Sequence, residues 1–233
     1  MTKISERGMI FNAEMVRALL DGRKTQTRRP IKWKQTRFTE IGEREDGSKW
    51  PWSEDAEHAC DFWHPCPFGA VGDRIWVREA FRVHSRATDV ATLVYKASER
   101  NSWTEQTRRV PVAVCNKPAT PEKWTPSLHM PRWASRIMLE ITGVRVERLN
   151  AISPEDAESE GLERTNFTGF GDAPGLPSYP EPDVYFDPLK KQWKEYPPEA
   201  FAGLWESIYG EGSWKANPWV WVIEFKRVEG GAA

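Results

Sequence analysis

Cysteine is scarce in this sequence, and long hydrophobic runs are missing from it. The 233 residues include three cysteines, an odd number without framework spacing, which argues against a disulfide-stapled secreted domain. The longest apolar run covers residues 219–223, far fewer than the roughly 20 that span a bilayer. No apolar stretch of signal-peptide length stands near the N-terminus. We therefore expect a cytoplasmic protein that has no membrane partner.

Net charge is also nearly absent. The chain has 33 Lys and Arg against 34 Asp and Glu, a balance that does not predict a general nucleic-acid coat, since such a coat needs a broad basic surface. The basic residues nevertheless cluster, because Arg23, Lys24, Arg28 and Arg29 lie within one short segment. The 13 tryptophans leave several indole rings available as stacking surfaces. A local basic cleft is therefore compatible with the composition.

The length and the residue patterns predict one α+β domain over residues 1–233. Helices are predicted over 13–20 with Asn12 as the N-cap, over 153–161 with a Ser153-Pro154 start, and over 199–209. Strands are predicted over 23–29, 74–79, 90–96, 137–149 and 219–228. Residues 33–70 and 165–198 lack a period and are interpreted as two long loop insertions. Such strands with short flanking helices favour a small mixed or antiparallel β-barrel.

Several phrases of the sequence resemble those of one family. The segment from Gly22 to Arg29 resembles the G-x-K-T-x-T-x-R signature that opens ASCH domains, which are PUA-like barrels associated with RNA and nucleoside chemistry. The Gly72-Asp73 strand start, the acidic helix and the final strand resemble later parts of the same domain. Residues 66–69, 76–79, 129–136 and 217–222 resemble phrases of larger ASCH-like proteins common in phages and prophages. The resemblance covers most of the chain outside the two loops.

The resemblance implies a reaction site. Some small ASCH proteins are similar to amidohydrolases that remove the acyl group from N4-acetylcytidine, with a Lys, a Thr and a Glu as proposed site residues. These fall on Lys24, Thr27 and Glu160. A lysine whose pKa is lowered by burial or by nearby positive charge can act as a base toward a hydroxyl nucleophile. Because Lys24 and Thr27 are three residues apart, Lys24 must precede the strand if the two are to meet.

Glu160 also stands out from the residues alone. It lies at the end of its predicted helix, where the macrodipole disfavours a carboxylate by roughly 0.3–1 kcal/mol. It is three residues from Ala157, on the face expected to pack. A carboxylate in this position needs a cation, and we expect Lys24 to supply it. That ion pair could serve catalysis or structure alone.

Other residue groups were weighed as binding sites. Arg132, Trp133 and Arg136 combine an indole with guanidinium planes and are candidates, with Arg23, Arg28 and Arg29, for holding an unstacked base or phosphates. No cofactor is favoured. Cys60, His64 and Cys66, with His58, form the one metal-like grouping, a possible zinc site whose spacing matches no common finger.

Two hypotheses follow. The first is a hydrolase of a modified nucleoside or of RNA that works through Lys24, Thr27 and Glu160. The second is a non-catalytic PUA-like module that binds RNA, a nucleotide or a modified base. A binder needs Lys24 charged and exposed to phosphate, whereas a hydrolase needs it buried beside Thr27 and Glu160.

Overall fold

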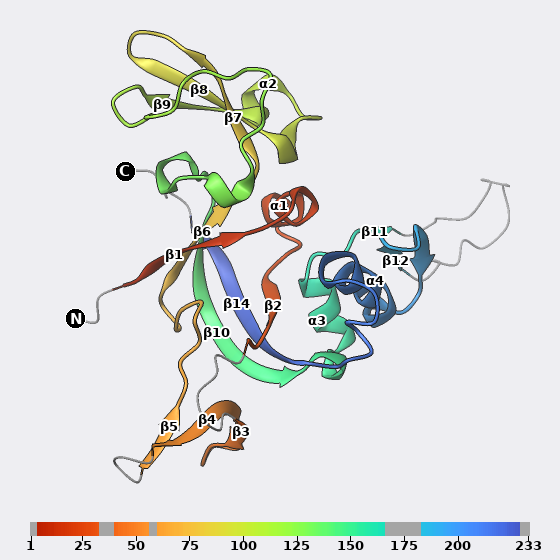
Figure 1. Ribbon diagram of the computed structural model, residues 1–233. Coiled ribbons are helices and arrows are strands. Elements are labelled where there is room, and N and C mark those ends of the chain that lie inside the picture. The colour runs from red at the N-terminus through yellow and green to blue at the C-terminus, as the bar shows by residue number, and fades with distance from the viewer. Residues whose placement is uncertain (1–3, 33–39, 56–59, 166–182, 229–233) are drawn as a thin grey trace, which may run out of the picture. The chain divides into compact units, whose positions relative to one another are not determined.

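The computed structural model describes residues 4–32, 40–55, 60–165 and 183–228 and has an α+β fold (Figure 1). Strands in several sheets predominate and helices are few, as the sequence predicts. The chain divides into two compact units. The first unit comprises Met1–Asp21, Pro65–Val144 and Glu224–Ala233, and the second comprises Gly22–His64 and Arg145–Ile223. Each unit is built from separate segments of the chain, whereas the sequence predicts one domain over residues 1–233.

The largest sheet has five strands in the order β1-β6-β10-β14-β2. Their bounds are β1 (Glu6–Ile10), β6 (Arg74–Arg78), β10 (Met138–Arg148), β14 (Trp219–Val228) and β2 (Gln26–Pro30). β1 pairs with β6 in parallel, and β10 pairs with β6 antiparallel, so the sheet is mixed. Within the described residues this sheet is open, with β1 and β2 at its two edges.

A three-stranded antiparallel sheet of β7 (Phe81–Arg86), β8 (Val90–Tyr95) and β9 (Thr107–Pro111) lies in the first unit. One face of this sheet builds a core from Phe81, Val83, Ala91, Leu93, Tyr95 and Val110. The helices of this unit are α1 (Ala13–Leu20), α2 (Trp103–Gln106) and the short 3₁₀ turns η1 (Lys96–Ser98), η2 (Ser127–His129) and η3 (Arg132–Ala134). α1 has the predicted bounds and the predicted cap, since Asn12 accepts from the Met15 backbone N–H at 2.8 Å.

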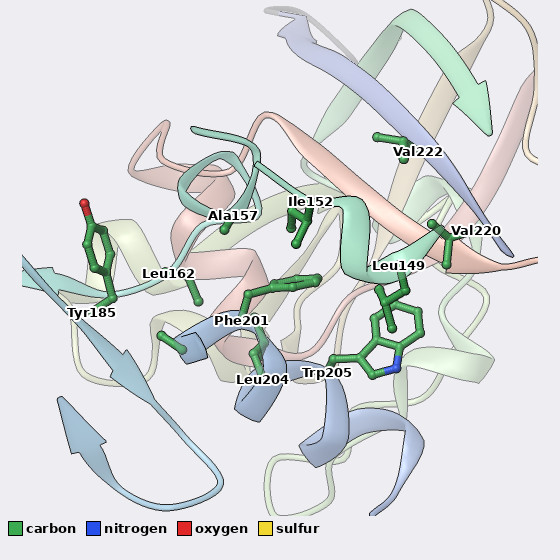
Figure 2. Close-up of a cluster of buried hydrophobic side chains, with 11 residues drawn as sticks. Leu149, Ile152, Ala157, Leu162, Tyr185, Phe201, Leu204, Trp205, Val220 and Val222 are labelled. Atoms are coloured by element: carbon green, nitrogen blue, oxygen red, sulfur yellow. The ribbon is translucent and has the colours of Figure 1, made fainter. Parts of the chain in front are cut away.

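Two small sheets and two α-helices belong to the part of the second unit that the structure describes. One sheet is β3 (Glu40–Glu43), β4 (Lys49–Asp55) and β5 (Cys60–Trp63), and the other is β11 (Arg164–Thr165), β12 (Val184–Asp187) and β13 (Gln192–Lys194). The helices are α3 (Pro154–Ser159), α4 (Pro197–Tyr209) and the 3₁₀ turn η4 (Leu149–Ala151). Figure 2 shows the core of this unit, in which α4 contributes Phe201, Leu204 and Trp205 against Leu149, Val220 and Val222.

The two segments interpreted as loops are partly ordered into regular structure. β3, β4 and β5 lie within 33–70, and β12, β13 and the first residues of α4 lie within 165–198. The two long loops predicted over 33–70 and 165–198 therefore contain strands in these parts, while residues 33–39, 56–59 and 166–182 lie outside the described residues. The predicted strand over 23–29 also begins later, at Gln26. No helix among the described residues has both the length and the apolar character that crossing a membrane requires.

Candidate active site

Lys24 lies just before β2, as a meeting with Thr27 would require. It forms an isolated antiparallel bridge with Glu160, and the strand begins two residues later. The Thr25 backbone N–H donates to Ser159 at 2.9 Å, which holds this segment against the end of α3. Gln26, Thr27 and Arg28 follow, and all three are buried. Four of the signature residues, Lys24, Gln26, Thr27 and Arg28, are therefore buried, whereas Arg23 and Thr25 are exposed.

Glu160 is the C-cap residue of α3, followed by Gly161 with a φ of 88°. A positive φ of this size suits glycine, which explains why the helix ends there. The Lys24 ammonium donates to Glu160 Oε2 at 2.7 Å and to the Glu160 backbone oxygen at 2.8 Å. The lysine proposed as partner of this carboxylate is thus confirmed as its partner.

Burial governs the electrostatics of the pair. The Lys24 side chain is wholly buried, and this desolvation lowers the pKa of its ammonium below the ordinary value of 10.5. The carboxylate of Glu160 opposes the shift, whereas the positive charges of Arg29 and Arg28 add to it. The Lys24 amine is therefore more readily neutral than the amine of an exposed lysine, and a neutral amine can accept a proton.

Arg28 completes the surroundings of Glu160. Its Nη1 donates to Glu160 Oε1 at 3.3 Å, and its Nη2 donates to Glu147 at 2.5 Å and to Asp156 at 2.8 Å. The guanidinium also lies 5.9 Å from the centre of the Phe201 ring. A guanidinium with three carboxylate partners and no exposure is held in place, so we assign Arg28 to fixing Glu160 rather than to contacting phosphate.

Two acidic side chains and one further arginine of this cluster were missed by the sequence reasoning. Arg145 donates to Asp156 at 2.5 Å and to Glu147 at 3.4 Å. Burial acts to raise the pKa of Asp156, but hydrogen bonds from Gln26 and Arg28 and the charges of Arg28 and Arg145 outweigh it and lower that pKa. Asp156 lies in the first turn of α3, where the helix dipole favours a carboxylate in any case, so its pairing with Arg28 and Arg145 leaves no separate signal in the sequence.

The other predicted basic residues have different surroundings. Arg23 is exposed and donates to the backbone oxygens of Gly161 and Leu162 at 2.9 and 3.0 Å, while Arg29 is half-buried in β2. Thr27 is 1% exposed. The structure thus brings Lys24, Arg28 and Glu160 into direct contact, with Thr27 in the adjoining strand.

Arg132, Trp133 and Arg136 belong to the first unit. Arg132 donates to Glu6 at 3.0 Å, and Arg136 binds both oxygens of Glu79 at 2.8 and 3.0 Å. The Trp133 ring packs edge-on against Phe81, with the centroids 6.3 Å apart. Arg136 and Trp133 therefore have structural contacts that account for their positions.

The proposed zinc ligands have separate surroundings. Cys60 is exposed, Cys66 is buried, and His64 Nε2 lies 2.8 Å from the Ser53 hydroxyl. His58 lies outside the described residues. Across the ranges that the structure describes, no three His, Cys, Asp or Glu side chains are placed to hold a metal ion together.

Comparison of the chain with protein-family models, with curated proteins and with solved structures gives no match.

Proposed function

We propose that this chain is an ASCH-type, PUA-like hydrolase of a modified nucleoside, and that Lys24, Thr27 and Glu160 are its reaction centre. The family assignment rests on the sequence phrases, and the mixed five-stranded sheet with short helices supports it. A PUA-like barrel would need that sheet to close on itself. N4-acylcytidine is the substrate class that the resemblance favours.

One observation supports the enzyme above all others. The Lys24 amine is completely buried, 2.7 Å from Glu160, and its pKa is lowered by that burial. A lysine that binds phosphate at the surface is neither buried nor lowered in pKa. Burial and a lowered pKa are both typical of lysines that act as general bases.

The proposed reaction is an acyl transfer. Neutral Lys24 takes the proton of the Thr27 hydroxyl, and the Thr27 oxygen attacks the acyl carbonyl carbon. The bond from that carbon to N4 then breaks, and the Lys24 ammonium returns the proton to the leaving amine. Lys24 then takes a proton from water, whose oxygen attacks the carbonyl carbon of the Thr27 ester. The bond from that carbon to Thr27 Oγ breaks, the Lys24 ammonium returns the proton to Oγ, and the carboxylic acid is released. Glu160 holds Lys24 in position throughout, and Arg28 holds Glu160.

Access to these groups requires movement. Lys24 is 3% exposed, Thr27 1% and Glu160 2%. A substrate therefore reaches them only when the elements that cover them separate. Single-stranded RNA is the second candidate substrate, and its cleavage would use the same buried Lys24 amine as the general base.

A non-catalytic binding module is the alternative, and the charge pairing of the buried cluster favours it. Glu160 is paired with both Lys24 and Arg28, as in a buried structural network. In that case a modified base or an RNA is bound without being changed.

The test is incubation of the purified protein with N4-acetylcytidine and with a short single-stranded RNA, followed by chromatography of the products. Turnover by the wild type that is lost in Thr27→Val and partly retained in Thr27→Ser supports the enzyme. Serine keeps the hydroxyl group that the proposed reaction uses, whereas valine lacks it. Lys32→Ala is the matched control, since Lys32 is an exposed lysine of the same segment.

Intact substrates in every sample overturn the catalytic proposal. Equilibrium dialysis of the same N4-acetylcytidine then measures whether the chain binds it, which is the prediction of the alternative.

A further inference from the structure

Positive charge is concentrated in one part of the first unit. Residues 74–136 contain 12 Lys and Arg against 5 Asp and Glu, although the whole chain has a net charge of −1. The strands β7, β8 and β9 carry four arginines and no acidic residue. A surface with such an excess attracts polyanions.

The register of this sheet places part of that charge on one face. Phe81, Val83 and Val110 point into the core, so Arg82, His84 and Arg109 point to the opposite, outer face. Arg109 pairs with Thr92, and Thr92 pairs in turn with Ser85. The outer face thus presents basic and small polar side chains across all three strands, which lie side by side in Figure 1.

Aromatic rings border the same face. The Arg82 guanidinium lies 4.6 Å from the centre of the Trp124 ring. The His84 and Trp103 rings meet edge to face, with centroids 5.0 Å apart. Trp103 is 52% exposed, which is unusual for so large an apolar side chain and leaves much of the indole open to a ligand.

Two polar atoms on this face have no hydrogen-bond partner among the described residues. They are Arg82 Nε and His84 Nδ1, and both atoms are buried. Buried polar atoms are nearly always paired in folded proteins, so these two atoms, like several other buried nitrogens of the chain, have hydrogen-bonding capacity that the described residues leave unused. Glu105 of the adjoining helix is instead engaged by the Ser102 backbone and hydroxyl at 3.1 and 2.9 Å.

We propose that this outer face, defined by Arg82, His84, Thr92, Arg109 and the rings of Trp103 and Trp124, binds single-stranded nucleic acid. Arg82 and Arg109 neutralise phosphates, and Trp103 stacks on a base. An acidic peptide would satisfy the charges but would give the exposed indole no planar partner. The inference goes beyond the proposed function, because it rests on residues of the first unit and needs no chemistry at Lys24.

Fluorescence anisotropy tests the proposal with fluorescein-labelled 12-mers of deoxythymidine and of uridine and with a 12-base-pair duplex, each in low and in high salt. The wild type should bind the single strands, more weakly as salt rises. Trp103→Ala combined with Arg109→Ala should weaken binding by about tenfold or more, and each lost phosphate contact should reduce the logarithmic salt slope by about 0.7. Both side chains are exposed, so the variant should fold normally.

Lys190→Ala combined with Tyr196→Ala is the matched control, since these residues are also a basic and an aromatic side chain but belong to the second unit. Equal loss in test and control variants, preference for the duplex, or no salt-dependent binding would overturn the proposal. Salt-dependent binding of the deoxythymidine 12-mer, of the uridine 12-mer or of both upholds the proposal and shows which nucleic acid is bound. The two assays use different variants and different readouts, so a failed hydrolysis assay and a failed binding assay remain separate results.

Discussion

Lys24 binds Glu160 twice, through the carboxylate and through the backbone oxygen of the same residue. The two contacts fix the end of α3 to the segment that leads into β2. Because both partners are buried, loss of either one would leave a buried charge with a weaker partner, whether or not the pair also performs chemistry.

Lys24→Met should therefore lower the free energy of unfolding by about 3–5 kcal/mol, since it leaves a buried carboxylate with a weaker partner. Urea unfolding measures the change, and Lys32→Met, at an exposed lysine, should stay within about 0.5 kcal/mol of wild type. The pKa of Lys24 is lower in the folded chain than its ordinary 10.5, so the unfolded chain binds more protons between the two values. The wild type should accordingly gain stability over Lys24→Met as pH rises toward 10.5. A narrowing difference would show that Lys24 is more basic in the fold.

Arg136→Ala should be strongly destabilising in the first unit. Burial raises the pKa of Glu79, and Arg136 opposes that shift through a bidentate ion pair. Without Arg136 the carboxylate is buried alone, which should cost about 3–5 kcal/mol near neutral pH. A carboxyl with a raised folded pKa stabilises fully below its ordinary 4.5 and loses that contribution as pH rises through the folded pKa. The deficit of the variant should therefore shrink in acid. Thermal unfolding across pH checks this, and adding Glu79→Gln should restore most of the loss.

Gly203→Ala should strain the second unit. A methyl group at this position would collide with both carboxylate oxygens of Asp187, which is buried and accepts from the backbone N–H groups of Leu189 and Lys190 at 2.9 and 3.1 Å. We expect a loss of about 1–3 kcal/mol. Asp187→Ala in the same chain should remove the collision, so the two substitutions should cost less together than the sum of their separate effects. Additive losses in denaturant unfolding would contradict the steric account.

Asp73→Ala should weaken the start of β6. The Asp73 carboxylate accepts from the backbone N–H groups of Ala70 and Ser5 at 3.0 and 2.8 Å, and these bonds lower its pKa below 3.8. The loss should be about 1–3 kcal/mol at neutral pH. The stabilisation is present above 3.8 and disappears as pH falls through the folded pKa, so wild type and variant should converge in strong acid. Asp89→Ala, at an exposed carboxylate of the same unit, serves as the control in chemical unfolding.

The sequence predicted those elements whose signals are local. α1 has an asparagine cap and an apolar stripe, and β14 has the predicted bounds. β3 and β4 were missed because Gly42 and Pro51 lie inside them and argue against strands. Gly42 is required there by a close approach, since a side chain would lie 3.0–3.1 Å from Trp63 and Trp52. That contact joins residues on different strands and leaves no periodic trace.

The candidate site was predictable to the same extent. Glu160 was conspicuous because it opposes its helix dipole, and this correctly indicated Lys24. The role of Arg28 was not predictable, because its partner Glu147 is 119 residues away and lies on β10. A basic run in a sequence does not show which of its members will be neutralised by distant carboxylates.

The sheet order has a consequence for synthesis of the chain. β14 is the latest of the described strands in sequence, yet it lies between β10 and β2. Until the ribosome has released residues 219–228, β2 cannot pair, and β10 has an unpaired edge. Such nascent intermediates expose strand edges that can join other chains, and the long loops to be closed slow folding. We expect the pairing of β10 and β2 with β14 to form late, whereas β1 can pair with β6 as soon as both strands have been made.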